Sequence, residues 1–109
     1  MSRIRLNKVE PGTTFPSDQA LFLLKEDNGY SSITTVEGEP DGAGTVQTFV
    51  LGFTKLAKAQ RFAKSDAGRG RVKNILQLPM HEFVEKHGHQ IQLVLDVNPD
   101  TYLALAAAS

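Results

Sequence analysis

Seven of the twelve cationic side chains lie between residues 55 and 73, in a chain of 109 residues whose formal net charge is zero. Residues 54–74 carry a net charge of +6, because Asp66 is their only anion, whereas residues 1–53 and residues 75–109 each carry −3. Such a cationic segment can bind phosphate groups or an acidic protein surface, with an affinity that falls as salt rises. The candidate binding residues are Lys58, Arg61, Lys64, Arg69, Arg71 and Lys73.

Two interpretations of this basic segment stay open. In one, it binds a partner. In the other, it is the solvated face of an amphipathic helix and pairs with the chain's own acidic loop. Among partners, an acidic protein is favoured over nucleic acid, because the segment's one aromatic residue, Phe62, is expected in the core and cannot stack on bases. Nothing in the sequence resembles an RNA-reading sheet or a DNA-recognition helix.

Three histidines within nine residues, His81, His87 and His89, raise a metal hypothesis. His81 and Glu85 are four residues apart, which places them on one face of a helix. A zinc site needs three or four converging ligands, and this spacing matches no recognised zinc motif. The competing interpretation is a histidine near a helix C-terminus, where the helix dipole favours a cation. We therefore expect no metal and no cofactor.

The motifs of common catalytic sites are absent. The chain has no cysteine, no Gly-x-Ser-x-Gly elbow, no phosphate-binding Gly-x-x-x-x-Gly-Lys loop and no dinucleotide-binding Gly-x-Gly-x-x-Gly. The Gly68–Arg71 stretch follows an expected helix, whereas a phosphate loop joins a strand to a helix N-terminus. With no signal-peptide core and no apolar run of about 20 residues, the sequence predicts a non-catalytic, cytoplasmic domain that does not bind membranes.

The basic segment must be positioned by a strand, Val46–Phe53, that runs into a helix from Thr54 to Ser65. Spacings of three and four residues place Leu56, Ala59, Phe62 and Ala63 on one helix face, so these side chains are expected to pack on a sheet. Thr54 is the expected N-cap, and Gly52 marks a bulge or a close approach of neighbouring chain.

The remaining elements follow from composition and turn signals. Asn28-Gly29 favours a type I′ turn between strands at residues 20–24 and 30–36. Pro79 suits the first position of a helix that Gly88 ends. The other expected elements are an irregular arm at 1–18 with a candidate edge strand at 3–6, loops at 37–45 and 66–73, strands at 74–78 and 91–97, and a helix at 102–108.

This succession, β-β-β-α-β-α-β with a short C-terminal helix, predicts a mixed β-sheet of the α/β or α+β class, with helices on one or both faces. The domain is expected to span residues 19–109 after the arm. Part of the sheet should be parallel, because strands and helices alternate from residue 46 onward.

Two stretches resemble the SseB-like family, named for an enhanced-serine-sensitivity protein and similar to its N-terminal domain. They are VLGFTKLAKAQRFAKS and LPMHEFVEKHGHQIQLVLDVNPDTYLALA, within residues 46–108. Where the family usually has a leucine directly before Asn-Pro, this chain has Asp96-Val97. The resemblance implies an α/β domain without known catalytic residues, and we expect a protein-binding or interaction role.

Self-association is a further expectation. The strand at Tyr30–Val36 carries no lysine or proline to protect an exposed edge, so a homodimer could form through it. The apolar C-terminal segment, with Tyr102, Leu103 and Leu105, offers a second dimer surface. The alternative is that this segment covers the chain's own sheet.

Overall fold

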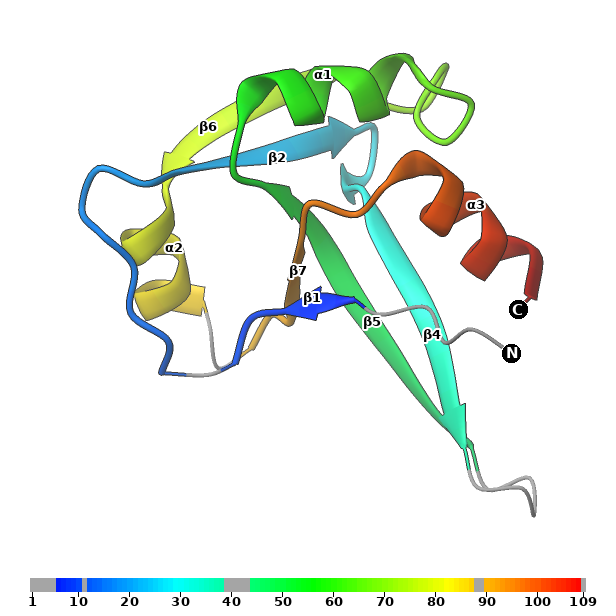
Figure 1. Cartoon of the computed structure of the whole chain (residues 1–109), viewed down its shortest axis with the longest axis horizontal. Coiled ribbons are helices and arrows are strands. Elements are labelled where there is room, and N and C mark those ends of the chain that lie inside the picture. The colour runs from blue at the N-terminus through cyan, green and yellow to red at the C-terminus, as the bar shows by residue number, and fades with distance from the viewer. Residues whose placement is uncertain (1–5, 11, 39–43, 88–89, 109) are drawn as a thin grey trace.

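A computed structural model describes residues 6–10, 12–38, 44–87 and 90–108. It has a mixed sheet and three helices, which confirms the predicted α+β class (Figure 1). The helices are α1 (Leu56–Lys64), α2 (Met80–His87) and α3 (Pro99–Ala108). The strands are β1 (Asn7–Lys8), β2 (Ala20–Glu26), β3 (Gly29–Tyr30), β4 (Ser32–Gly38), β5 (Gly44–Phe53), β6 (Asn74–Pro79) and β7 (Leu93–Leu95).

Strands β2 and β5 form the centre of the sheet. Along one edge of β2 lies β6, antiparallel to it from Ala20↔Pro79 to Lys25↔Asn74. On its other edge, β2 pairs with β3 and with the end of β5. The long strand β5 pairs with β4 over its first seven residues, and these two strands form an extended antiparallel ribbon (Figure 1).

The parallel pairing predicted from the alternation of strands and helices occurs between β5 and β7. Val50, Leu51 and Gly52 are paired with Leu93, Val94 and Leu95 in parallel register. On the far side of β7, β1 adds a short antiparallel edge. The edge strand expected at residues 3–6 lies mostly outside the described residues. The end of β5 therefore lies between β7 and β2.

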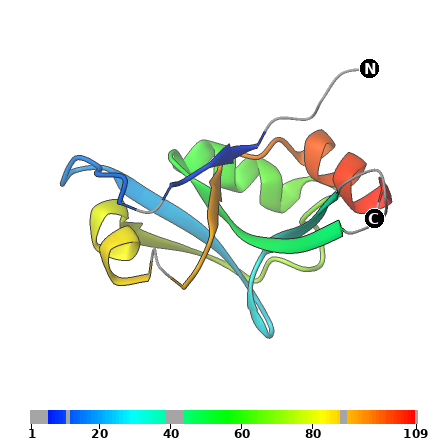
Figure 2. The ribbon, with the colours of Figure 1, turned by 90° about the horizontal axis from the view of Figure 1, so that it is seen from below.

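An apolar cluster covers each face of the sheet at β2. Leu21 and Leu23 of β2 pack with α2 in one apolar cluster, while Phe22 and Leu24 pack on the opposite side with α1 and α3. Figure 2 shows α1 and α3 along the same side of the sheet. Alternation with a period of two sends neighbouring strand residues to opposite faces, which is why one apolar run can supply both clusters.

Gly52 lies at a close approach of side chains, one of the two alternatives that the sequence left open. A Cβ atom on this residue would lie 2.7 Å from Leu21 Cδ1 and 3.0 Å from Leu93 Cδ1. Both leucines are buried in the α2-side cluster. Glycine at this position lets the two neighbouring strands place their leucines over the backbone of β5.

Two predictions about the start of α1 are wrong. The N-cap is Lys55, which makes no side-chain capping bond, because the hydroxyl of Thr54 donates to Asp96 instead. Ala59 and Phe62 are buried as predicted, but Leu56 is 46% exposed. Helical side chains lean toward the N-terminus, so a side chain in the first turn projects beyond the sheet that the helix covers.

The predicted first hairpin is also partly wrong. β2 and β3 do pair antiparallel, with Glu26 opposite Gly29. The two turn residues are therefore Asp27 and Asn28, and neither has the positive φ of a type I′ turn. The return strand leaves β2 at the buried residue Ser31, whose amide donates to Leu24 and whose carbonyl accepts from Leu51 of β5. Its longer part, β4, pairs with β5.

Several element boundaries differ from the predicted ones. Strand pairing reaches Gly38 and Gly44, inside the expected loop at 37–45. The expected loop at 66–73 folds as hydrogen-bonded turns, in which Ala67 and Gly68 are buried. Pro79 ends β6, and α2 begins one residue later. The ending of α2 at Gly88 falls outside the described residues.

The last strand and helix also shift. β7 covers three residues of the predicted 91–97. It starts later because the amide of Ile91 donates to the His87 carbonyl in a turn, and it ends earlier because Asp96 adopts φ 56° and turns the chain out of the sheet. α3 starts three residues earlier than expected, at Pro99. The side chain of Asn98 accepts from the amide of Asp100 at 2.9 Å and caps this helix.

Candidate functional site

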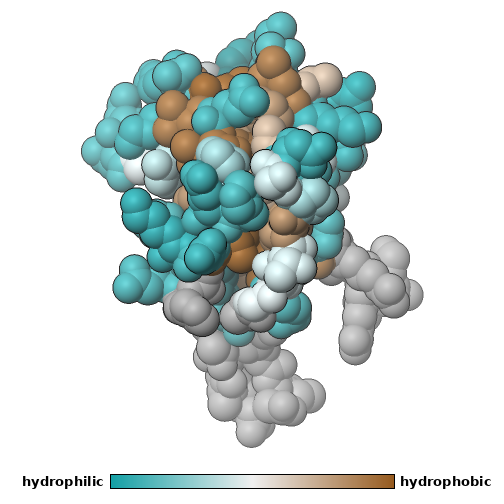
Figure 3. Space-filling model, turned by 90° about the vertical axis from the view of Figure 1, so that its left-hand side faces the viewer, coloured by the Kyte–Doolittle hydropathy of each residue, from teal (hydrophilic) through white to brown (hydrophobic). Residues whose placement is uncertain are grey.

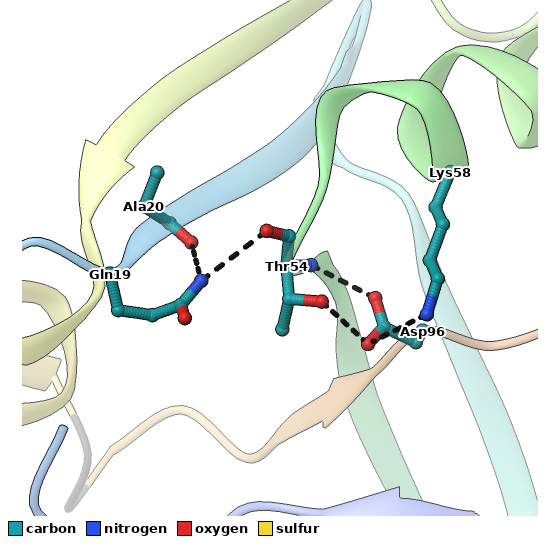
Figure 4. Close-up of polar contacts among 5 residues, drawn as sticks. All are labelled: Gln19, Ala20, Thr54, Lys58 and Asp96. Atoms are coloured by element: carbon teal, nitrogen blue, oxygen red, sulfur yellow. Dashed lines mark hydrogen bonds and ion pairs between the residues drawn. The ribbon is translucent and has the colours of Figure 1, made fainter. Parts of the chain in front are cut away.

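The carboxyl ends of the parallel strands β5 and β7 lie side by side and carry Thr54 and Asp96. The carboxylate of Asp96 accepts two hydrogen bonds from Thr54, one from the amide at 2.9 Å and one from the hydroxyl at 2.8 Å (Figure 4). The chain after β5 leads into α1, and the chain after β7 leads into α3. Crevices outside the carboxyl ends of parallel strands are the usual ligand sites of open α/β sheets.

Two further side chains surround this contact. Lys58, in the first turn of α1, lies 3.6 Å from Asp96 Oδ2. Gln19 donates from its amide nitrogen to the carbonyls of Ala20 and Thr54, at 2.8 and 3.3 Å, and so ties the start of β2 to the same corner (Figure 4). Thr54 is thus fixed on both sides, by Gln19 and by Asp96.

The backbone of Asp96 is unusual. Its φ of 56° lies in the left-handed region, which costs a residue with a Cβ atom roughly 1–2 kcal/mol. The two hydrogen bonds from Thr54 offset this cost, because bonds to a charged group contribute about 1.5–3 kcal/mol each. A left-handed residue at the mouth of a crevice is a reason to look for function there.

A hollow of about 190 Å³ opens beside Asp96, between α1 and the start of α3. Lys58 and Arg61 supply its cations, and Asp96 is its one acid. The carboxylate of Asp96 is only 19% exposed and already accepts from Thr54 and pairs with Lys58. The other lining residues are Phe53, Val97, Asn98 and Pro99. The N-terminal end of α3 adds a partial positive charge, so the hollow favours an anion.

The structure divides the six predicted binding residues into two groups. Four of them make contacts within the chain. Lys58 pairs with Asp96, and Arg69 pairs with Asp66 at 2.6 Å. Lys73 donates to the Gly70 carbonyl at 3.4 Å. Arg71 lies 3.9 Å from Glu26 and donates to the hydroxyl of Tyr102.

Arg61 and Lys64 form the second group. Both are exposed on α1, and within the described part of the chain neither has an ion-pair partner. The acids that pair with cations of the first group are Asp96, Asp66 and Glu26. The acidic loop at 37–45, which was the expected pairing partner, lies largely outside the described residues. Of the six predicted binding residues, Arg61 and Lys64 are therefore the two most available to a partner.

The predicted metal candidates are not brought together. Among the described residues, no three His, Asp or Glu side chains lie close enough to hold a metal ion. His87 packs its ring 5.1 Å from Phe83, and His89 lies outside the described residues. His81 and Glu85 line one cleft on α2, as their spacing predicted. The Nδ1 atom of His81 is buried without a hydrogen-bond partner.

Sequence reasoning missed Asp96 and Thr54 as a pair. They are 42 residues apart, and only the parallel pairing of β5 and β7 brings them together. The one local signal was the position of each residue at the end of an apolar strand, just before a helix.

No family model, curated protein or solved structure matches this chain. Among the described residues, no helix has the length and apolar character needed to cross a membrane.

Proposed function

We propose that the chain is a non-catalytic interaction domain that binds an acidic segment of a partner protein. The binding surface consists of the exposed face of α1, with Arg61 and Lys64, and the adjoining hollow beside Asp96. One observation carries the proposal: Arg61 is exposed, has no acidic partner in the described part of the fold, and lines a hollow at the N-terminal end of α3.

The hollow suits a carboxylate side chain. An incoming carboxylate would meet the guanidinium of Arg61, which can donate two parallel hydrogen bonds, and the ammonium of Lys58. Phe53, Val97 and Pro99 would contact its methylene groups. Lys64 lies one turn beyond Arg61 on the exposed face and would attract further acids of the same segment.

Nucleic acid is the less favoured partner. Phe62 is 1% exposed and packs against Phe53 and Tyr102 at ring distances of 5.5 and 5.3 Å. It is therefore not free to stack on bases, which is how proteins commonly hold single strands. A phosphate backbone could still bind the cations, so nucleic acid is an outcome that the experiment must separate.

A photo-crosslinking residue at Gln60 tests the proposal in the native host. Gln60 is exposed on α1, next to Arg61 and one turn before Lys64, so a partner bound to these cations would lie within reach. The matched control is the same residue at Gln77, which is exposed on β6. We expect an acidic protein to crosslink from position 60 and not from position 77. The same products from both positions, or products removed by nuclease, would refute the proposal.

Three further proposals accompany this function. We propose that the chain belongs to the SseB-like family, and we propose that it is located in the cytoplasm. A homodimer remains a proposal as well. For the C-terminal segment, Tyr102 is 6% exposed and packs on Phe62, which supports the alternative that α3 covers its own sheet. Leu103 of α3 is 39% exposed and remains available to a second copy.

A further inference from the structure

A second hollow lies on the other side of the sheet, between the N-terminal arm and α2. It is a cleft of about 340 Å³, and its walls are Gly12–Phe15 from the arm and His81, Val84 and Glu85 from α2. The three helical residues share one face because they are spaced by three and four. On this side of the molecule, apolar residues are exposed among hydrophilic ones (Figure 3).

The arm is held in place around the cleft. Phe15 packs against the apolar cluster beneath α2. Thr13 donates from its amide and its hydroxyl to the carbonyl of Glu10, at 3.1 and 2.7 Å. Gly12 has φ +85°, a conformation that a residue with a Cβ atom rarely adopts. The arm thus follows a defined path that leaves the cleft open between it and α2.

The polar groups of the cleft are mainly hydrogen-bond acceptors. Glu85 is exposed, and no cation of the described residues pairs with it. The hydroxyl oxygens of Thr13 and Thr14 can accept hydrogen bonds whatever they donate to. His81 carries a buried Nδ1 atom without a partner. A half-turn of its imidazole about the Cβ–Cγ bond would carry this nitrogen to the position that Cδ2 now occupies.

We infer that this cleft binds a small organic cation, a primary ammonium group on a short apolar stem. The ammonium has three N–H donors and a positive charge, which match the carboxylate of Glu85 and the oxygens of Thr13 and Thr14. The stem contacts Phe15 and Val84. His81 accepts a donor of the ligand after its ring turns. The cleft's volume falls within the range of small-molecule sites, which combine apolar walls with a few polar groups.

Other ligand classes fit less well. A metal ion would need a third protein ligand beside His81 and Glu85, and the described residues supply none. An anion would meet the unpaired charge of Glu85. The site is also separate from the basic face of α1, since α1 and α2 pack on opposite faces of the sheet. The cation site in the cleft therefore does not depend on the proposed acidic partner.

Titration of the full chain with n-butylammonium chloride, followed by amide chemical shifts, tests the inference. n-Butanol and butanoate serve as the neutral and anionic ligands of the same size. For a ligand this small we expect a Kd of about 1–50 mM. The expected result is saturable shifts confined to residues 12–15 and 81–85, together with a change at the ring nitrogens of His81.

Two variants on the same helix separate a specific site from general attraction. Glu85→Gln removes the carboxylate that lines the cleft, and Glu82→Gln removes an exposed carboxylate of α2 that does not line it. We expect Glu85→Gln to weaken n-butylammonium binding about fivefold or more and Glu82→Gln to leave it unchanged within about twofold. Both residues are exposed, so both variants should fold.

Three results would overturn the inference. One is equal weakening in the two variants, which would mean unspecific attraction to the acidic helix. Another is binding of n-butanol or butanoate as tight as that of n-butylammonium. The last is the absence of saturation up to about 200 mM, well above the expected range.

Discussion

The carboxylate of Asp96 accepts two hydrogen bonds from Thr54, one from the Thr54 amide and one from the Thr54 hydroxyl. The two residues are 42 positions apart in the sequence. The pair joins the carboxyl ends of the two parallel strands, β5 and β7, at the point where each chain turns toward a helix. Lys58 of α1 pairs with the same carboxylate. This one acid thus joins the start of the basic helix to the chain that leads into α3.

Asp96→Ala should lower the free energy of unfolding by about 2–4 kcal/mol, because it removes two bonds to a charged acceptor and leaves a left-handed alanine. Asp96→Asn should cost less, since its oxygen can still accept from the Thr54 amide and asparagine tolerates this backbone. Urea unfolding of both variants measures the difference. Equal stability of Asp96→Ala and the wild type would contradict the role given to this residue.

Phe62 and Leu56 form a matched test of how α1 faces the sheet. Phe62→Ala should cost about 3–5 kcal/mol, because the ring is fully enclosed between Phe53 and Tyr102. Leu56→Ala, at a position that is 46% exposed, should cost less than about 1 kcal/mol. Chemical denaturation of the two variants checks this order. A larger loss for Leu56→Ala would mean that the helix is rotated from the orientation described.

Gly52→Ala should destabilise the chain by about 1–3 kcal/mol, because its new methyl group would lie 2.7 Å from Leu21 Cδ1 in a closed cluster. Shortening the neighbour with Leu21→Val should recover part of this loss in the double variant. Thermal or urea unfolding of the two single variants and the double variant measures the coupling. Strict additivity would mean that the close approach is relaxed in solution.

Arg71→Met should destabilise the fold by about 1–2 kcal/mol, because the guanidinium donates to Tyr102 and pairs with Glu26. Lys64→Met, which removes an exposed cation without an ion pair in the described residues, should change stability by less than about 0.5 kcal/mol. The comparison separates a structural cation from one available for binding. Equal losses of stability in the two variants would contradict this difference between Arg71 and Lys64.

Local patterns predicted much of the fold. The order of strands and helices from β5 onward and the burial of Phe62 both follow from periodicity, which depends only on neighbouring residues. Leu56 fits the same periodicity and is nevertheless exposed. The pattern specifies a face of the helix, but it does not specify how far the sheet beneath that face extends.

Pairings between distant segments could not be predicted. Thr54 resembles a helix cap by residue type and position. Its hydroxyl nevertheless donates to Asp96, which directly follows β7 and is distant in the sequence. Likewise, no residue near Ser31 indicates that its carbonyl accepts from the amide of Leu51. This bond marks the point where the chain stops pairing with β2 and starts pairing with β5. The cations of the candidate site were therefore predictable from the sequence, whereas the pairing of Lys58 and Thr54 with Asp96 was not.

The most direct test of the central claim is the binding of a labelled oligo-glutamate peptide, followed by fluorescence anisotropy at about 50 mM salt, where screening is weak. Arg61→Glu is compared with Lys86→Glu, a matched charge reversal at an exposed residue of α2 on the opposite face of the sheet. We predict that Arg61→Glu weakens binding about fivefold or more, while Lys86→Glu changes it by less than about twofold. Equal weakening by the two substitutions would contradict a binding surface on α1.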